Sequence, residues 1–464
     1  MNLSLDAICA QIKGEIIKGP SWMNIQAIST DSRNTVVGSL FFALAGDNYD
    51  GHDYVLQALH RGASASVISR SWDPLLPIPE GKTLIQVEDT LTALQDLAAY
   101  YRAQFPIPLI AVSGSVGKTT TKEMLYYCLS TKYITLKTEA NYNNDIGVPL
   151  TLFRLEENHQ AAVLEMAMRS PGEILRLVNI ARPSCAVITN VERVHLENLG
   201  RIENVAQAKC EIMAHLSPED FALINGDSEV LVKAASKYSC RQYTFGFQSH
   251  CDFQIEQVQL DSQGMYIDMD LMGKRAHLHF YLPSKRLASN IAACAGLAYL
   301  MGLDLASIQT GLDAYQPYGN RLNIHKYPEG GALINDTYNA NPLSMAVALE
   351  TARELARPGR LIAVLGDMYE LGDYELKGHM EVGQKAWEIK VDILIAVGDR
   401  AQFIAQGAKE AGMPADQIYY FQEPENSLDL IQQVFDKSST IVFKASRGME
   451  LEKLIDKALI LEEG

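Results

Sequence analysis

The sequence predicts an α/β protein of three domains, in which a small α/β domain precedes a central parallel sheet with covering helices and a C-terminal doubly wound sheet. The chain has 464 residues, which is too long for a single hydrophobic core. Short apolar runs alternate with helical segments over most of its length. One of these runs leads through a glycine-rich turn into a helix. We place the domains at residues 1–82, 83–316 and 317–464.

The N-terminal domain is expected to mix short strands with a helix. Its polar string STDSR precedes the apolar strand LFFAL, and a turn rich in Gly, Asp and Asn follows. This order suits a ligand-facing loop and equally an ordinary surface loop of an α/β domain. Residues 71–82 are rich in proline and predict the boundary with the central domain.

The glycine-rich turn lies in the string LIAVSGSVGKTTTKE, residues 109–123. Gly114 and Gly117 let the backbone turn with its N–H groups inward, where Lys118 can reach phosphates and Thr119 a magnesium ion. The turn is a shorter variant of the P-loop, because the glycine expected five residues before Gly117 is missing. We predict nucleotide binding here, although such turns can also join a strand to a helix without a ligand.

Three apolar runs of the central domain each end at a polar side chain, namely Glu165, Asn190 and Asn225. Ligands of an open α/β sheet bind at the carboxyl ends of its strands, so we expect these side chains to share a crevice with the P-loop. Between residues 253 and 282, apolar and polar residues alternate, with turns at DSQG and MGKR. This change of period predicts an antiparallel excursion.

The C-terminal domain repeats the alternation of strands and helices. Its predicted strands lie at residues 332–334, 361–365, 393–397 and 440–443. They indicate a second doubly wound, Rossmann-like sheet. Because this domain has no glycine fingerprint, we interpret it as a substrate-binding lid and not as a dinucleotide site.

A nucleotide site of this kind needs acidic or histidine ligands for magnesium and further cations for the phosphates. Glu165 is the natural metal ligand, although a carboxylate at this position could instead cap the next turn. His195, in NVERVHLENLG, is either a metal ligand or a loop histidine. The composition around Lys209 is typical of a solvated helix lysine.

The junction before the C-terminal domain adds further polar candidates. Arg321 follows a Gly-Asn hinge, where domain closure could bring it to a phosphate, but it could equally lie on the surface. Asp336 ends a predicted strand, and Tyr338, Asn339 and Asn341 crowd the turn behind it. Such a turn is either a ligand edge or an elaborate helix cap.

The composition argues against several classes of function. The formal net charge of -16 argues against a nucleic acid as the main partner. No window approaches eighteen consecutive apolar residues and the N-terminus lacks a signal-peptide pattern, so we expect a cytoplasmic protein without membrane insertion. The seven cysteines are scattered without a CxxC pair, which indicates neither a zinc site nor a disulfide framework.

Five strings carry a resemblance to one family along nearly the whole chain: SGSVGKTTTKE, NYNNDIGVPLTL, LEMAMRSPGEI, NDTYNANPLSM and LGDMYELG. The chain resembles the ATP-dependent Mur ligases of peptidoglycan synthesis, and most of all the members that add D-alanyl-D-alanine to UDP-N-acetylmuramoyl-tripeptide. The resemblance implies a UDP-sugar domain, an ATPase domain and a lid, in a monomer that supports cell-wall biogenesis, cell shape and cell division. It also implies that ATP phosphorylates the tripeptide carboxylate, and that the dipeptide amine attacks the acyl phosphate.

The resemblance further implies roles for individual residues. Catalytic roles are expected for Lys118, His195 and Lys209, and Lys209 matches a position that many members carbamylate to hold a second magnesium ion. The expected metal ligands are Thr119, Glu165, His195 and Lys209. The expected nucleotide contacts are Gly114, Ser115, Gly117, Lys118, Thr119, Thr120, Asn290, Arg321 and Asp336. The expected substrate contacts are Ser32, Arg33, Asn141, Asn143, Asn144, Tyr338, Asn339 and Asn341.

Some strings depart from the family pattern. Glu192 and Arg193 stand near His195 where small residues are commoner, and KCEI, which begins at Lys209, replaces KGEI. Two other interpretations stay open, namely a relative with another acceptor, such as a folylpolyglutamate-synthase-like enzyme, and a regulatory NTPase. The TDSR segment favours a UDP-linked donor, and the last domain argues against the regulatory NTPase.

Overall fold

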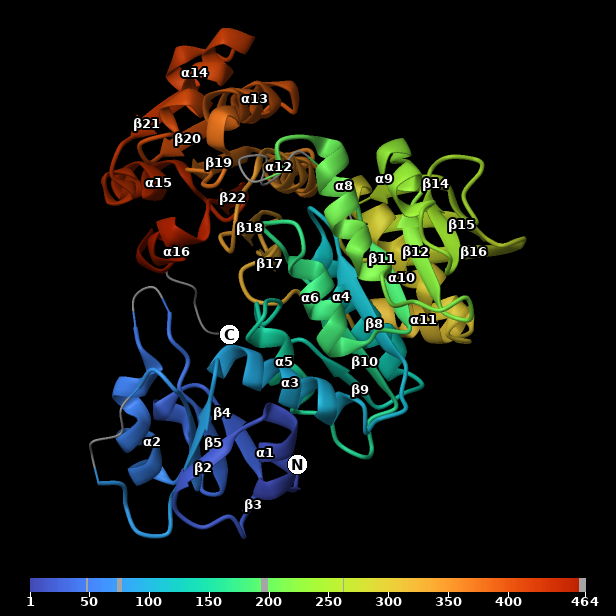
Figure 1. Ribbon diagram of the computed structural model, residues 1–464. Helices are drawn as coiled ribbons and strands as arrows, with labels where there is room; N and C mark the ends of the chain where they lie inside the picture. The colour runs from blue at the N-terminus through green and yellow to red at the C-terminus, as the bar shows by residue number, and fades with distance from the viewer. Residues whose placement is uncertain (47–48, 73–76, 193–198, 262, 459–464) are drawn as a thin grey trace.

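The computed structural model describes residues 1–46, 49–72, 77–192, 199–261 and 263–458. Within these ranges the chain forms three lobes, coloured in Figure 1 from blue at the N-terminus through green and yellow to red. Each lobe is built on its own sheet with covering helices. This architecture confirms the predicted α/β fold class.

The N-terminal lobe contains a five-stranded sheet in which β2 alone runs antiparallel to its neighbour. The strand order is β2 (Glu15–Lys18), β7 (Thr83–Val87), β6 (Ala65–Ser69), β5 (Ser39–Phe42) and β4 (Ala27–Ser29). The remaining elements are β1 (Leu3–Ser4), β3 (Asn24–Ile25), α1 (Leu5–Ile12) and α2 (Val55–Arg61). Because β7 pairs with β6, the strand that follows the predicted boundary at residue 82 belongs to this lobe and not to the central sheet.

The central lobe is organised around a nine-stranded sheet. In spatial order its strands are β9 (Thr135–Lys137), β10 (Ala161–Glu165), β8 (Leu109–Ser113), β11 (Cys185–Ile188), β12 (Phe221–Asn225), β13 (Arg241–Gly246), β14 (Phe253–Asp261), β15 (Gly264–Leu271) and β16 (Lys274–Phe280). The strands from β9 to β14 run parallel, and the last two pairings are antiparallel. The predicted antiparallel excursion is therefore confirmed, and it extends the parallel sheet.

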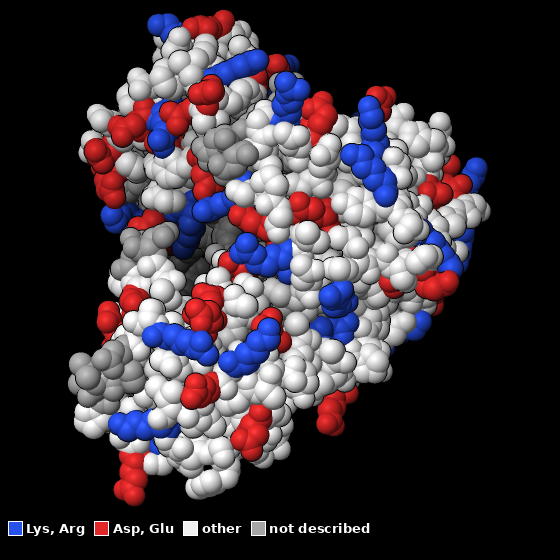
Figure 2. Space-filling model, viewed as in Figure 1, with Lys and Arg blue, Asp and Glu red and all other residues white. Residues whose placement is uncertain are grey.

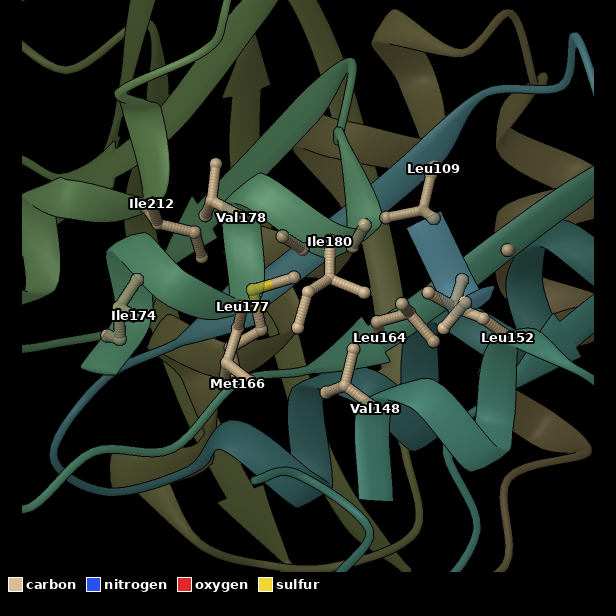
Figure 3. Close-up of a cluster of buried hydrophobic side chains, with 14 of the residues drawn as sticks. Leu109, Val148, Leu152, Leu164, Met166, Ile174, Leu177, Val178, Ile180 and Ile212 are labelled. Atoms are coloured by element: carbon tan, nitrogen blue, oxygen red, sulfur yellow. The ribbon is translucent and has the colours of Figure 1, made fainter. Parts of the chain in front are cut away.

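Helices cover both faces of the central sheet. They are α3 (Thr90–Arg102), α4 (Lys118–Ser130), α5 (Gly147–Leu152), α6 (Glu173–Ala181), α8 (Ile202–Cys210), α9 (Glu229–Ala235), α10 (Ala288–Leu300) and α11 (Leu305–Asp313). On one face, α4, α10 and α11 pack over buried strand residues such as Ile110 and Val112. On the other face, Leu109 and Leu164 meet α5 and α6, as Figure 3 shows around Val148 and Leu177. The sheet is thus buried on both sides, as a parallel sheet requires.

The core of the second face continues into the N-terminal lobe. Helix α3 carries Leu94 and Leu97 into a cluster that also contains Ile8 of α1 and Leu177 of α6, and all four side chains are buried. Burial of such apolar side chains stabilises by roughly 1.5–3 kcal/mol each. The N-terminal and central lobes therefore share one hydrophobic core.

The C-terminal lobe has a six-stranded sheet that is parallel except for β17. Its strand order is β17 (Asn323–Lys326), β18 (Ala332–Asn335), β22 (Thr440–Lys444), β19 (Leu361–Gly366), β20 (Ile393–Val397) and β21 (Ile418–Phe421). The helices are α12 (Pro342–Ala356), α13 (Glu375–Glu388), α14 (Gln402–Ala411), α15 (Leu428–Val434) and α16 (Glu452–Ala458). All four predicted strands are present, which confirms the second doubly wound sheet.

Candidate functional site

A cavity of about 1090 Å³ lies where the central lobe meets the C-terminal lobe. Glu165, Asn190 and Asn225 all line it together with the P-loop, which confirms that these strand-end residues share a crevice. The opposite wall comes from the C-terminal lobe and includes Asp336 and Lys444. Figure 2 shows that the surface is hollowed where the lobes meet, with side chains of both charges at the rim.

The two glycines of the P-loop are required by their surroundings. Gly114 and Gly117 have φ of +151° and +83°, a region that L side chains rarely adopt. A Cβ atom on Gly114 would lie 1.9 Å from Oγ1 of Thr189, and one on Gly117 would lie 2.2 Å from Nδ2 of Asn290. Both positions therefore bring the loop backbone closer to its neighbours than any side chain would allow.

Asn190 holds the P-loop in place from the next strand. Its Oδ1 accepts hydrogen bonds from the N–H groups of Ser115 and Val116 at 3.1 and 2.9 Å. Its Nδ2 donates to the carbonyl of Val116 at 3.0 Å, and Oγ1 of Thr189 donates to the same carbonyl at 2.7 Å. We predicted that Asn190 faces the crevice, but its role as a clamp on the loop was not foreseen.

Lys118 begins helix α4 and lines the cavity as a half-buried side chain. Its Nζ donates to the carbonyls of Gly114 and Ser115 at 2.8 and 3.2 Å. Burial lowers the pKa of Lys118, Glu165 opposes this shift, and Arg321 adds to it. The ammonium group is thus fixed at the mouth of the loop, where a phosphate would compensate its desolvation.

Glu165 is buried at the end of β10 and is tied to two other predicted residues. Oγ1 of Thr119 donates to one carboxylate oxygen at 2.8 Å, and Nδ2 of Asn143 donates to the other at 2.8 Å. These contacts come from the P-loop helix and from the loop of the NYNND string, so the alternative role of Glu165 as a turn cap is not what the structure shows.

The oxygen atoms of Thr119 and Glu165 are suitable donors for a magnesium ion. Magnesium usually takes one or two protein carboxylates and completes its shell with phosphates and water. In the described part of the chain, no three His, Cys, Asp or Glu side chains are grouped as a metal site. The donor set therefore fits a magnesium ion carried in with a nucleotide. His195 lies outside the described residues.

Lys209 lies in α8 and is buried, so the prediction of a solvated helix lysine is wrong. Burial lowers its pKa well below the usual value, and the positive charge of Lys118 adds to this effect. Such a shift leaves a larger neutral fraction of the amine at pH 7. Lys209 is not part of the cavity wall.

On the lid side, Arg321 and Asp336 both line the cavity. The guanidinium of Arg321 lies 3.9 Å from the centre of the Tyr338 ring, and its buried Nε atom has no hydrogen-bond partner in the described structure. Asp336 accepts from the N–H of Leu322 at 3.0 Å and from Nζ of Lys444 at 2.6 Å. Arg321 thus brings a positive charge and an unpaired donor to the cavity wall, which suits an anion.

Lys444 was missed by the sequence analysis. It is buried at the end of β22, and its Nζ also donates to the carbonyl of Asn339 at 2.8 Å. Burial lowers its pKa, while Asp336 raises it and Arg321 lowers it further. The same rule of polar residues at strand ends that identified Glu165 would have found Lys444, but the predicted strand was ended at Phe443.

Some of the predicted polar residues around the cavity form hydrogen bonds at the start of a helix. Asn341 is the N-cap of α12 and forms a capping box with Ser344, so the helix-cap interpretation is confirmed, although Asn341 also lines the cavity. Oδ1 of Asn144 accepts from the N–H of Gly147 at 2.8 Å at the start of α5. Other predicted residues in the cavity wall are Thr120, Asn141, Asn143, Asn290, Tyr338 and Asn339.

Two predicted substrate residues lie away from this cavity. Ser32 and Arg33 belong to the N-terminal lobe and are not part of the cavity wall. Ser32 donates to Oε1 of Gln57 at 2.6 Å, and Arg33 forms an exposed ion pair with Asp31 at 2.9 Å. The structure therefore does not bring them together with the P-loop.

Comparisons with known proteins connect this site to one family. The chain matches three family domains: the catalytic domain of the Mur ligase family at residues 24–102, the Mur ligase middle domain at 112–298, and the Mur ligase, glutamate ligase domain at 320–447. The UDP-N-acetylmuramoyl-tripeptide--D-alanyl-D-alanine ligase of Bacillus subtilis (strain 168) is 38% identical over 435 residues, which are 93% of this chain and 92% of the relative.

Solved structures give the same result. MurF from Acinetobacter baumannii superposes with a TM-score of 0.87 at 30% identity and covers 98% of both chains. The MurF ligase of Thermotoga maritima in complex with ADP superposes with a TM-score of 0.80 at 26% identity, over 93% of this chain and 96% of that one. In the described residues, no helix has both the length and the apolar character needed to cross a bilayer.

Proposed function

The chain belongs to the Mur ligase family, and we propose from this premise that it is the ATP-dependent ligase that joins D-alanyl-D-alanine to UDP-N-acetylmuramoyl-tripeptide. The single observation that carries the proposal is the cavity between the lobes. It places a P-loop against the Asp336–Lys444 pair, in a chain whose relatives bear this activity in their names.

The reaction needs two steps because a carboxylate is a poor electrophile. An oxygen of the tripeptide carboxylate first attacks the γ-phosphorus of ATP, which gives an acyl phosphate and ADP. The dipeptide amine then attacks the acyl carbon, so that an amide forms, phosphate leaves and the amine releases a proton. Phosphorylation thus supplies both the activation and the leaving group.

The residues of the chain act mainly through position and charge. The ammonium of Lys118 lies at the P-loop, where it stabilises negative charge that develops during phosphoryl transfer. Arg321 offers a buried donor from the lid side. Lys444 holds Asp336, which in turn fixes the backbone of Leu322 in the hinge segment. Closure of the lid would exclude water from the acyl phosphate.

We propose that Thr119 and Glu165 hold a magnesium ion, with His195 and Lys209 as the further ligands that the family resemblance implies. When bound, magnesium neutralises charge on the transferred phosphate. The lowered pKa of Lys209 supports carbamylation, because only its neutral amine can attack carbon dioxide and lose a proton to form a carbamate. A carbonyl signal after exchange with 13C-bicarbonate, absent in Lys209→Met, is the expected result.

We also propose the finer assignments that depend on this function. Asn141, Asn143 and Asn144 would line the channel of the muramoyl peptide, while Ser32 and Arg33 would bind the uridine nucleotide on the N-terminal lobe. We further propose that the protein works in the cytoplasm as a monomer and serves cell division, as the family resemblance implies.

The test is phosphate release from ATP and magnesium in four mixtures: enzyme alone, with UDP-N-acetylmuramoyl-tripeptide, with D-alanyl-D-alanine, and with both. We expect release only when both are present, together with a product whose mass equals the joined substrates. Equal release in all four mixtures would leave an unassigned NTPase. The alternative is another Mur-type or folylpolyglutamate-synthase-like ligase, which the names of the relatives disfavour. Phosphate release when another amine acceptor replaces D-alanyl-D-alanine, and none with D-alanyl-D-alanine itself, would favour that alternative.

A further inference from the structure

A buried charged pair lies on helix α4, one turn after the proposed metal-site residue Thr119. The side chains of Lys122 and Glu123 are exposed by only 0% and 2%, and Nζ of Lys122 lies 2.8 Å from Oε1 of Glu123. Burying two charges costs free energy unless their geometry is tightly fixed. Neither residue is part of the cavity wall, so their effect on the site has to pass through other groups.

The first group is Thr138, which directly follows β9. Nζ of Lys122 donates to the carbonyl of Thr138 at 2.8 Å, and the Thr138 hydroxyl accepts from the N–H of Glu165 at 3.0 Å. Thr138 is completely buried. One residue thus joins the ammonium group of Lys122 to the backbone of Glu165.

Thr138 also begins the loop that carries Asn143. This loop passes through Ala140, whose φ is +48°, before Asn143 donates to Glu165 at 2.8 Å. A strained turn of this kind keeps its shape only when its ends are anchored. Because Lys122 anchors the first residue of this stretch, it supports Glu165 from the backbone side and from the side-chain side.

The third contact of Lys122 reaches the junction between the lobes. Its Nζ lies 5.4 Å from the centre of the Tyr318 ring, within the range of a cation–π interaction. Tyr318 lies in the segment between α11 and β17, which connects the central lobe to the C-terminal lobe. A movement of this segment would therefore change the position of the Lys122 ammonium group.

We propose that Lys122 is a positioning residue that couples the hinge segment at Tyr318 to the metal-site carboxylate Glu165 through Thr138. The proposal rests on the proposed function, because it assumes that Glu165 holds magnesium with the nucleotide. Glu123 forms an ion pair with Lys122 and a second one with Lys137. Because Lys122 is not part of the cavity wall, its proposed effect is on the position of the Glu165 carboxylate.

Lys137 provides a matched control. Its ammonium pairs with the same Glu123 carboxylate, but its other contacts are with the rings of Tyr126 and Tyr127, at 4.2 and 5.5 Å from the ring centres. Lys122→Met and Lys137→Met therefore remove the same charge from Glu123. Only the first variant breaks the connection to Thr138 and Tyr318.

The readout is the affinity for manganese, used as the probe ion in the presence of ADP and followed by electron paramagnetic resonance. We expect Lys122→Met to weaken manganese binding about 10-fold, as is typical when a group that orients a metal ligand is removed. The magnesium concentration for half-maximal ligase activity should rise with it, while the KM for ATP at saturating magnesium stays unchanged. Lys137→Met should change each value by less than about 2-fold.

Equal weakening in the two lysine variants would overturn the proposal, because the charge balance of Glu123 would then be the cause. If Lys122→Met does not fold, Thr138→Val decides the question. It keeps both lysines and removes only the hydroxyl that accepts from Glu165, and it should weaken manganese binding by a similar factor. Unchanged binding in Thr138→Val would also overturn the proposal. If the unmodified protein binds no manganese with ADP, the proposed function itself fails, which is a different result.

Discussion

The central lobe meets the N-terminal lobe through an apolar core, and it meets the C-terminal lobe through charges and a cavity. At the first junction, α3 carries buried side chains such as Leu97 into the core of both lobes. At the second junction, ion pairs join Arg286 to Glu350 at 2.8 Å and Arg169 to Glu370 at 3.1 Å. An apolar core resists opening, whereas ion pairs at a polar surface are worth little and exchange easily with water.

The hinge segment and the start of β17 cross the junction between the central and C-terminal lobes. Leu322 and Ile324 pack against the core of the central lobe and against the core of the C-terminal lobe. From the difference between the junctions we expect the first two lobes to act as one body and the C-terminal lobe to move against it. The substrates that must be shielded from water would bind at the junction that can open.

The largest expected effect is at the P-loop, where a substitution at the polar junction should lower activity without lowering the stability of the fold. Lys118→Ala should lower kcat by about 1,000-fold or more, because the ammonium at the phosphates is lost. Circular dichroism and the thermal midpoint should stay those of the unmodified protein. Lys132→Ala, which removes an exposed lysine just beyond α4, is the control and should leave kcat within about 2-fold. Loss of the folded signal in Lys118→Ala would show a structural role instead.

The next largest effect is expected on the stability of the apolar junction. Leu97→Ala should cost about 2–5 kcal/mol of unfolding free energy, because it leaves a cavity in the shared core. Hydrogen exchange should then rise in the N-terminal lobe and in the central lobe together.

Leu349→Ala is the matched change in the core of the C-terminal lobe. It should raise hydrogen exchange in that lobe alone. If Leu97→Ala affected only the N-terminal lobe, the shared core would not behave as one unit, and the comparison between the junctions would fail.

The smallest expected effect concerns the tether of the polar junction. Glu350→Gln removes the ion pairs with Arg286 and Lys385 and should change the unfolding free energy by at most about 1 kcal/mol. The radius of gyration from small-angle scattering should nevertheless increase, because the lobes lose a direct contact. Glu388→Gln, which removes a pairing of Lys385 within α13, should leave the radius unchanged.

The same tether predicts a pH dependence. Burial raises the pKa of Glu350, but its hydrogen bonds with Arg286 and Lys385 outweigh this effect and leave the pKa below the usual value of 4.5. A carboxyl with a lowered folded-state pKa stabilises above its unfolded pKa and loses this contribution as the pH falls through the folded pKa. The radius should therefore increase only as the pH falls below the usual carboxyl pKa of 4.5, and in Glu350→Gln it should not depend on pH. An increase at neutral pH would contradict this assignment.

Much of the fold and of the cavity wall could be predicted because strand ends in a doubly wound sheet carry the ligands. Glu165, Asn190 and Asn225 were identified by this rule alone. The strands β17 and β21 were missed because each has only four residues and their side chains are exposed or half-buried, so neither shows the pattern of a buried strand. Composition alone indicated a solvated Lys209, because the sequence of one helix does not show what packs against it.

The boundary between the first two domains illustrates a second limit. Prolines before residue 83 indicated a linker, but pairing of β7 with β6 is a contact between distant segments that local composition cannot show. The same is true of the connection from Lys122 to Glu165, which depends on a backbone carbonyl. Contacts of this kind become visible only when the strands are placed side by side.

We expect ligands to close the polar junction and to leave the apolar junction unchanged. Spin labels at the exposed sites Lys237→Cys and Lys409→Cys span the polar junction, and labels at Lys237→Cys and Lys18→Cys span the apolar one. With an ATP analogue and UDP-N-acetylmuramoyl-tripeptide, we expect the 237–409 distance to shorten and the 237–18 distance to stay the same. If both distances changed, or if neither did, the account would be contradicted.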